Sequence, residues 1–228
     1  MSQTGVVTRL ALRELWISFR LLFLLAAYVG AGALVALVPA PLPTVLQRLA
    51  VGLAAAMIAG ASIAAWSLSR ERALGRAAWL TTRSVPRWTI LVGWFVALAV
   101  ISLLGLLAVS ALGWLAASTP IVRLDPLAFG ATFAAIACGA LGLLALGLLI
   151  GTLLRPLAAG LASAVLSGAI VGAAWLALPR IAIPIEVLAQ LQELARPISV
   201  AIPGAGAGLA VAAVLLLAAR VAMDRVDL

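Results

Sequence analysis

The sequence contains no lysine, no histidine and only one cysteine, Cys138, among its 228 residues. Without lysine the chain cannot form a phosphate-binding loop of the Gly-x-x-x-x-Gly-Lys-Ser/Thr type, so it cannot hydrolyse ATP by that route. Without histidine it lacks histidine metal ligands and the Ser-His and Cys-His pairs of nucleophilic enzymes. One cysteine excludes an internal disulfide, and we expect Cys138 to pack as a small hydrophobic residue.

Charge is scarce and mainly positive, with 15 basic and 7 acidic residues. Charged residues make up 10% of the chain, hydrophobic residues make up 66%, and every one of the 15 basic residues is arginine. Soluble domains are about 45–50% apolar and about 25% charged, so this composition indicates a protein that lies in lipid. We attribute the positive charge to cytoplasmic loops that face anionic lipid, and not to nucleic-acid binding.

Six apolar runs are long enough to cross a bilayer, which takes about 20 helical residues. The expected spans are 21–38, 50–69, 89–117, 127–154, 156–178 and 199–221. All six must be helices, because lipid offers no other partners for backbone N–H and C=O groups. We therefore expect one all-α integral membrane domain over residues 1–228, with an uncleaved first span because no clear small-residue cleavage site follows it.

The arginines predict the orientation of these spans, because basic residues gather in cytoplasmic loops. The larger group lies before the first span, between spans two and three, after span four and after span six. Its members are Arg9, Arg13, Arg20, Arg70, Arg72, Arg76, Arg83, Arg87, Arg155, Arg220 and Arg225. The opposite side has only Arg48, Arg123, Arg180 and Arg196. We expect both termini in the cytoplasm of a bacterium, with the chain in the inner membrane.

The segment before the first span, residues 6–20, reads as an amphipathic helix. At about 100° per residue, Arg9, Arg13 and Arg20 fall on one stripe, with Trp16 beside them. Such a helix is typical of the membrane interface. The alternative is a simple basic flank to the first span.

The loop between the second and third spans predicts a short helix from Glu71 to about Thr82. In that helix Arg72 and Arg76 would share a basic face, because they are four residues apart, and Leu80 would belong to an apolar strip. The helix must end before Pro86. It is either a docking surface for another protein or an ordinary positive-inside loop.

The stretch before the last span mixes charged and apolar residues between two prolines. We expect a short amphipathic helix at the outer surface, from Pro184 to Pro197, followed by a break at Pro203 and Gly204. This segment is either a gate or a plain support for the last span. Its candidate gate residues are Glu186, Glu193, Pro203 and Gly204.

The spans themselves carry little that could do chemistry. No acidic or basic residue lies at mid-span, which disfavours a proton-coupled carrier or pump. Small residues recur four apart in the pairs Gly147/Gly151, Gly168/Gly172 and Gly204/Gly208. Such pairs let helices approach closely, either within one chain or between two copies.

The residues in and around the expected cytoplasmic helix resemble a motif of a known protein family. An acidic residue, a glycine, a leucine-containing turn and a proline followed by a basic residue appear as Glu71, Gly75, Trp79-Leu80 and Pro86-Arg87. Together with the six spans, the interfacial helix and the outer helix, this resembles the membrane subunits of type 2 ATP-binding-cassette exporters. Members of that family often have Thr-Leu-Glu after the glycine, where this chain has Arg76-Ala77-Ala78.

The resemblance implies a permease subunit that is not itself an enzyme and needs no cofactor. Two such chains, alike or different, would form a dimer in the membrane lipid and bind separate ATP-binding-cassette ATPase subunits. The residues that the resemblance implies for ATPase coupling are Glu71, Arg72, Gly75, Arg76, Trp79, Leu80, Pro86 and Arg87. The alternatives are a structural or assembly membrane protein without transport activity, and a carrier that works without nucleotide.

Overall fold

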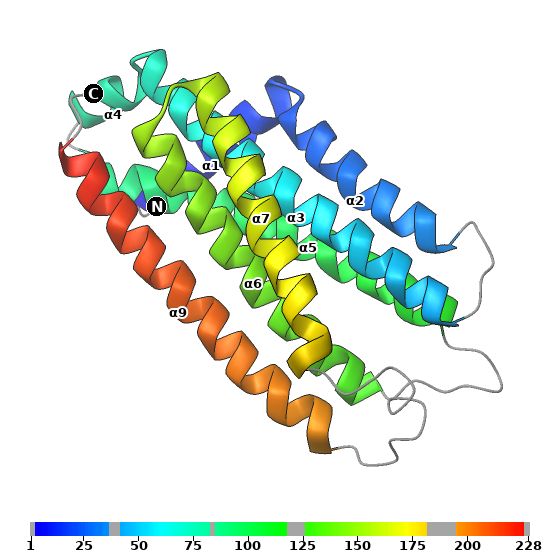
Figure 1. Cartoon of the computed structure of the whole chain (residues 1–228). Coiled ribbons are helices and arrows are strands. Elements are labelled where there is room, and N and C mark those ends of the chain that lie inside the picture. The colour runs from blue at the N-terminus through cyan, green and yellow to red at the C-terminus, as the bar shows by residue number, and fades with distance from the viewer. Residues whose placement is uncertain (1–2, 37–41, 83–84, 118–125, 182–194, 226–228) are drawn as a thin grey trace.

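The computed structural model describes residues 3–36, 42–82, 85–117, 126–181 and 195–225, and within these ranges the chain has no β-strand. The helices are α1 (Gln3–Ile17), α2 (Arg20–Ala36), α3 (Leu42–Ala73), α4 (Arg76–Thr82), α5 (Arg87–Ala117), α6 (Pro126–Leu153), α7 (Pro156–Ile181) and α9 (Ala195–Arg225). The long helices run side by side, with α1 and α4 toward one end of the bundle (Figure 1). The expected all-α fold is confirmed for the described residues.

Five helices are long and apolar enough to cross a membrane. Their spanning stretches are Gln47–Ala73, Arg87–Leu115, Phe129–Leu153, Pro156–Ala174 and Ile202–Arg225. They correspond to the expected second to sixth spans. Helix α2 passes the same criterion only together with α1, from which it is bent by 76°. A sixth span therefore stays a prediction.

The expected single helix over residues 6–20 is wrong, because the chain breaks between α1 and α2. Phe19 adopts the left-handed conformation with φ of 59°, and its N–H donates to the carbonyl of Trp16 at 3.2 Å. The Ser18 hydroxyl donates to the Glu14 carbonyl at 2.6 Å and so satisfies the open end of α1. Arg20 consequently starts α2 and does not share a helix face with Arg9 and Arg13.

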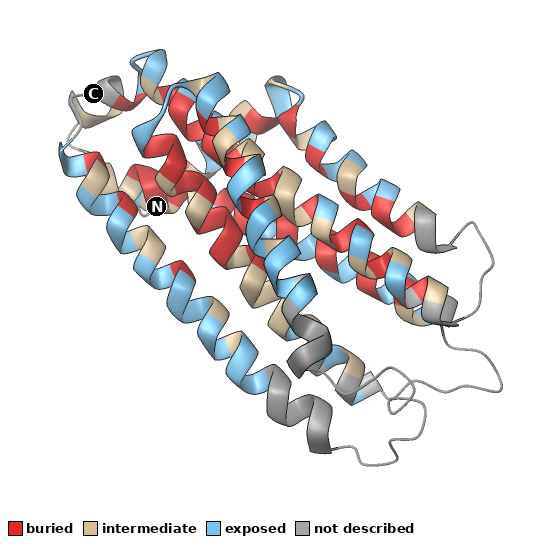
Figure 2. Cartoon of the chain, in the orientation of Figure 1, coloured by how far each residue is buried: buried red, intermediate tan, exposed pale blue. Residues whose placement is uncertain are grey.

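Helix α3 is the centre of the bundle and packs against α2, α5, α6 and α7. Its contact with α6 is made by glycines: a Cβ on Gly151 would lie 2.6 Å from the carbonyl oxygen of Ala65, and Gly147 lies equally tightly against Ala61. Buried residues line the sides of α3, α5 and α6 that face one another (Figure 2). Because lipid tails are as apolar as leucine, this close packing is what holds such helices together.

Helix α9 packs along α6 and is continuous, so the expected break at Pro203 and Gly204 is wrong. Prolines are tolerated inside membrane helices when neighbouring groups satisfy the freed carbonyl. Pro197 does not stop a helix either, because it lies in the first turn of α9, where its missing N–H has no helical partner to lose. The other candidate gate residues, Glu186 and Glu193, lie outside the described residues.

Candidate functional site

The candidate site is the break between α3 and α4. The last turn of α3 contains Glu71 and Arg72, and the chain then turns at Leu74 and Gly75 before α4 begins at Arg76. Gly75 has φ of 68°, and its N–H donates to the Arg72 carbonyl at 3.0 Å. A glycine in this conformation just past a helix end is a common helix terminator. The expected helix starting at Glu71 is therefore wrong, since Glu71 and Arg76 belong to different helices.

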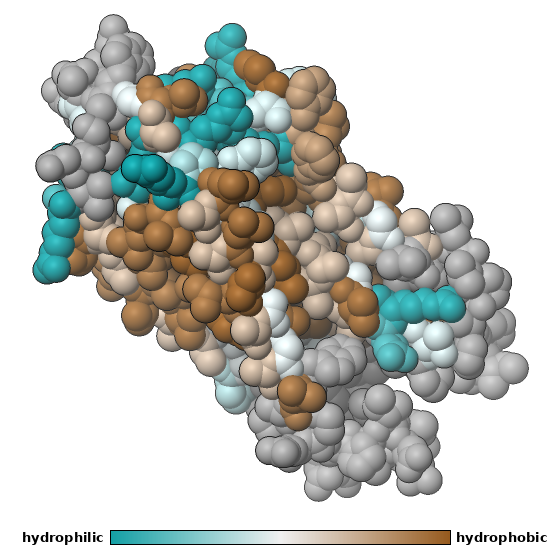
Figure 3. All heavy atoms as spheres, turned by 45° about the horizontal axis from the view of Figure 1, so that its top comes forward, coloured by the Kyte–Doolittle hydropathy of each residue, from teal (hydrophilic) through white to brown (hydrophobic). Residues whose placement is uncertain are grey.

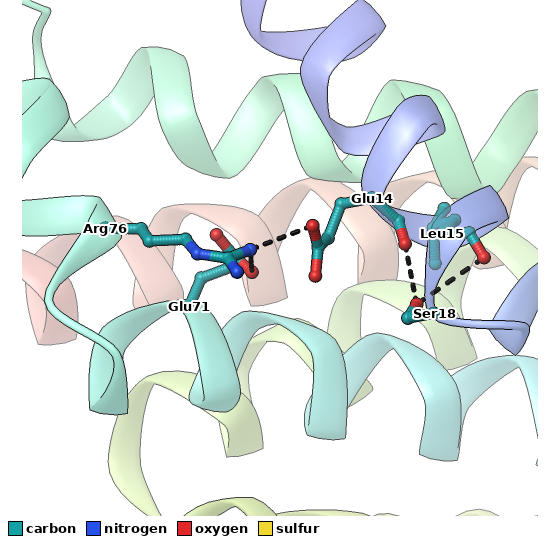
Figure 4. Close-up of polar contacts among 5 residues, drawn as sticks. All are labelled: Glu14, Leu15, Ser18, Glu71 and Arg76. Carbon is teal, nitrogen blue, oxygen red and sulfur yellow. Dashed lines mark hydrogen bonds and ion pairs between the residues drawn. The ribbon is translucent and has the colours of Figure 1, made fainter.

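An ion-pair cluster joins three helices across this break. The Arg76 guanidinium lies 2.8 Å from Glu14 of α1 and 3.3 Å from Glu71 of α3 (Figure 4). Glu71 is buried, whereas about half of the Arg76 side chain is exposed. Glu71 chiefly, with help from Glu14, raises the pKa of the Arg76 guanidinium above its ordinary value. Ion pairs that water reaches contribute about 0–1 kcal/mol, and the half-exposed Arg76 gives water access to both pairs, so the cluster positions α4 more than it stabilises the fold.

A second arginine lies beside this cluster and is almost fully buried. Arg20, at the start of α2, is 2% exposed, and none of its side-chain nitrogens donates a hydrogen bond to the described part of the chain. Its guanidinium lies over the Trp66 ring, 5.1 Å from the centroid. Glu14 and Glu71 are near enough to attract it electrostatically. Among the described residues only Arg76, on the surface of the bundle, forms ion pairs with these glutamates, whereas Arg20 lies inside the bundle without one.

The expected basic face of Arg72 and Arg76 is wrong. Arg72 instead extends from α3 to the end of α6. It donates to the carbonyls of Gly151, at 3.0 Å, and of Thr152. The Ser69 hydroxyl donates to the Leu154 carbonyl just beyond. The last carbonyls of a helix have no partner within it, and cationic side chains stabilise this end. These contacts fix the end of α3 against the turn between α6 and α7.

Arg87 has a similar structural role at another helix end. Its guanidinium donates to the carbonyls of Met223 and Asp224 in the last turn of α9, at 2.9 and 3.3 Å. In the same region Arg220 of α9 lies over the ring of Trp88, 5.5 Å from the centroid. The first turn of α5 and the last turn of α9 are thus held together.

The remaining predicted coupling residues lie around α4. Ala77 is buried, and Leu80 is half-buried against the hydrophobic core, so this short helix is anchored on one side. Trp79 lies in α4, but its side chain is outside the described part of the structure. Pro86 is exposed just before α5. The structure therefore brings Glu71 and Arg76 together, whereas Arg72 contacts the end of α6 and Arg87 contacts the end of α9.

The sequence analysis missed the part that Glu14 has in this cluster. Glu14 is the only acidic residue before Glu71, and it stands in an otherwise basic helix. An isolated acidic residue in such a position was a signal that it has a cationic partner. The partner could not be identified from the sequence, because Arg76 is 62 positions away along the chain and meets Glu14 only through the bends at Phe19 and Gly75.

A hollow away from the ion-pair cluster is apolar. It is a groove of about 600 Å³ between α2 and α5, lined by residues that include Leu25, Tyr28, Leu104, Gly105 and Leu112. It brings together no acid–base pair, and the described residues hold no group of three or more side chains that could bind a metal ion. On the face shown in Figure 3, hydrophilic atoms gather mainly toward one end, with a smaller patch near the other. No family model matches this sequence, and no curated protein is significantly similar to it.

Proposed function

We propose that this chain is the membrane-spanning subunit of an ATP-driven exporter, coupled to a separate ATPase subunit. The observation that carries the proposal is the connection of α1, α3 and α4 through Glu14, Glu71 and Arg76 next to an exposed helix break. A short surface helix that is joined by ion pairs to two other helices is suited to receive force from a partner protein. The absence of lysine supports an external motor, since the chain has no phosphate-binding lysine of its own.

The contacts around α4 support a route for that force. On one side Ala77 and Leu80 attach α4 to the core, and on the other the Gly75 turn leaves open space around it. The end of α3 is fixed to α6 by Arg72, so a displacement of α4 would be taken up by the Gly75 turn and by the ion pairs. The displacement of α4 would then be transmitted to α1 through Glu14, and from α1 to α2 through the break at Phe19.

The orientation of the chain supports the same proposal. Arg70, Arg155 and Arg225 lie at or beside helix ends, and Arg9 and Arg13 lie within α1, which is toward the same end of the bundle (Figure 1). All five belong to the larger of the two arginine groups of the sequence. By the positive-inside rule this end of the bundle faces the cytoplasm, where ATPase subunits are found. Two copies of the chain, or this chain with a similar one, would complete the translocation path in the bacterial inner membrane.

The orientation can be tested without a partner. Gly75→Cys in a Cys138→Ser background should react with a membrane-impermeant maleimide in inverted vesicles and not in intact cells. Leu127→Cys at the start of α6 is the matched control, because its side chain is exposed at the opposite end of the bundle, and it should react in intact cells. Labelling of position 75 in intact cells would contradict both the cytoplasmic docking surface and the coupling to an ATPase.

The coupling itself is tested with the ATPase that copurifies with the chain in mild detergent. Glu71→Gln and Arg76→Gln should leave the complex folded and ATP turnover measurable, but transport per ATP in vesicles should fall severalfold. Arg155→Gln is the control, since Arg155 is an exposed arginine of the turn between α6 and α7. Equal transport per ATP in all three variants would contradict coupling through this cluster. Purification without any ATPase would favour a structural protein, and transport without nucleotide would favour a carrier.

A further inference from the structure

The face of α1 that points away from the bundle carries two exposed arginines, Arg9 and Arg13. Helix α1 rests on α5 through Val7, Ala11 and Leu15, which are all buried, and a Cβ on Gly93 of α5 would nearly coincide with the Val7 side chain. Because α1 is bent by 76° from α2, it lies close to the membrane plane when α2 crosses the membrane. Its free side then faces the interface between lipid and water.

Two arginines on this free side share one hollow. Arg9 and Arg13 line a depression of about 460 Å³ together with Val6 and Leu10. They are four residues apart, so their side chains extend from the same face of α1. Both are exposed, and no ion pair to either is present among the described residues. The nearest acidic residue in sequence, Glu14, is turned toward Arg76 at 2.8 Å and so leaves their charge uncompensated.

Apolar side chains are exposed beside these arginines, since Val6 and Leu10 line the same hollow, and further exposed apolar and aromatic side chains follow along the chain. Trp16, Ile17 and Phe19 are each more than half exposed at the end of α1, and Phe23 in the first turn of α2 is 70% exposed. Tryptophan and other amphipathic side chains gather at the headgroup level of membranes, with basic residues beside them. A soluble anion would gain nothing from this apolar rim, whereas a lipid places its phosphate and its hydrocarbon next to each other.

We propose that Arg9 and Arg13 of α1 form a binding site for the phosphate of an anionic phospholipid. Arginine suits this ligand because its planar guanidinium can donate two parallel hydrogen bonds to phosphate oxygens. Val6 and Leu10 contact the start of the acyl chains. Two positive charges without acidic neighbours favour a lipid of net negative charge over a zwitterionic one. The lipid site depends on the membrane position of α1 and not on any ATPase. A failure of this proposal would therefore leave the proposed function unaffected, and the reverse is also true.

The test is native mass spectrometry of the whole chain, purified in detergent and titrated with phosphatidylglycerol, with phosphatidylcholine or with inorganic phosphate. The wild-type chain should retain phosphatidylglycerol selectively. Arg9→Gln/Arg13→Gln should weaken that retention roughly tenfold or more, because each basic residue near anionic lipid contributes substantially. The matched control is Arg155→Gln/Arg225→Gln, which removes the same charge from two other exposed arginines and should retain the lipid.

Equal loss in both double variants would show a nonspecific charge effect and would overturn the site. Equal retention of phosphatidylcholine by the wild-type chain would overturn the selectivity for anionic lipid, and displacement by inorganic phosphate would show a soluble-anion site instead. Unchanged melting temperatures of the variants in detergent without added lipid show that a loss of binding is not a loss of fold. Both substituted side chains are exposed, so we expect this control to hold.

Discussion

Two pairs of glycines with the same spacing lie in opposite surroundings. Gly147 and Gly151 of α6 face the backbone of α3 so closely that an added Cβ would overlap the carbonyls of Ala61 and Ala65. Gly168 and Gly172 of α7 have no atom of another described helix within 4 Å of an added Cβ. Two glycines four residues apart show that another helix can pack closely against this face. They do not show whether that helix belongs to the same chain.

The same contrast holds for the whole helices. In the most hydrophobic stretch of the α6 span 44% of the residues are buried within the chain, but only 17% are buried in α7 and 11% in α9. Figure 2 shows α7 and α9 with mostly exposed surfaces beside the buried faces of α3 and α6. The corresponding share is 44% in α3 and 50% in α5, so α3, α5 and α6 form the packed part of the bundle. Most of the surface of α7 and α9 is left for lipid or for another chain.

The largest effect should come from filling the contact between α3 and α6. Gly147→Val places a branched side chain against the backbone of α3, which cannot rotate away as a side chain would. Overpacking costs typically 1–3 kcal/mol and occasionally more, and here we expect about 3 kcal/mol or more. The measurement is the melting temperature in detergent, together with the monodisperse fraction on size exclusion. Gly172→Val is the matched control on α7, and an equal loss in both variants would contradict the comparison.

A smaller loss should follow from the same substitution where α9 meets α6. An added Cβ on Gly208 would lie 2.8 Å from the backbone carbon of Cys138. Because α9 packs mainly on this one neighbour, it can move outward and relieve part of the clash. We expect Gly208→Val to cost about 1–3 kcal/mol, less than Gly147→Val under the same conditions. A loss as large as that of Gly147→Val would show that α9 is held more firmly than its burial indicates.

A third glycine is required for its conformation and not for space. Gly75 has φ of 68° and nothing within 4 Å of an added Cβ, so a side chain there fits but strains the backbone. Gly75→Ala should cost about 1 kcal/mol, measured by thermal unfolding, because the left-handed conformation disfavours a Cβ by roughly 1–2 kcal/mol. Gly75→Asn should cost less, since asparagine adopts this conformation more readily. Equal effects of alanine and asparagine would mean that the turn is held by something other than its backbone conformation.

Apolar run length predicted five of the spans because an apolar run that lies in lipid must be helical. It does not apply to α1 and α4, whose mixed composition lets a helix continue or bend at little cost. The helix expected over 6–20 ends at Ile17, and the helix expected from Glu71 begins at Arg76, whereas its end at Thr82 is as expected. The proline rule failed in α9, since Pro203 lies inside a helix whose glycines pack on α6. Of the site, the sequence pointed to Glu71, Gly75 and Arg76, it placed Arg20 on the basic stripe of the first helix, and it did not point to Glu14. Their meeting depends on the bends at Phe19 and Gly75, and a left-handed phenylalanine has no sequence signature.

The smallest effect should be that of Gly172→Val, which we expect to change the melting temperature of the chain in detergent by the equivalent of less than about 0.5 kcal/mol. The reason is that an added Cβ at this position meets no other described helix within 4 Å. The proposed dimer allows a second copy to cover this face of α7, which can be tested by disulfide cross-linking of Leu176→Cys chains in a Cys138→Ser background. In that case Gly172→Val should reduce the cross-linking, while the monomer keeps its melting temperature. Leu176 suits this assay because it lies one helical turn beyond Gly172 and is 75% exposed. A melting temperature lowered as far as that of Gly208→Val, with no change in cross-linking, would show that α7 is packed within its own chain, and the contrast between the two glycine pairs would be lost.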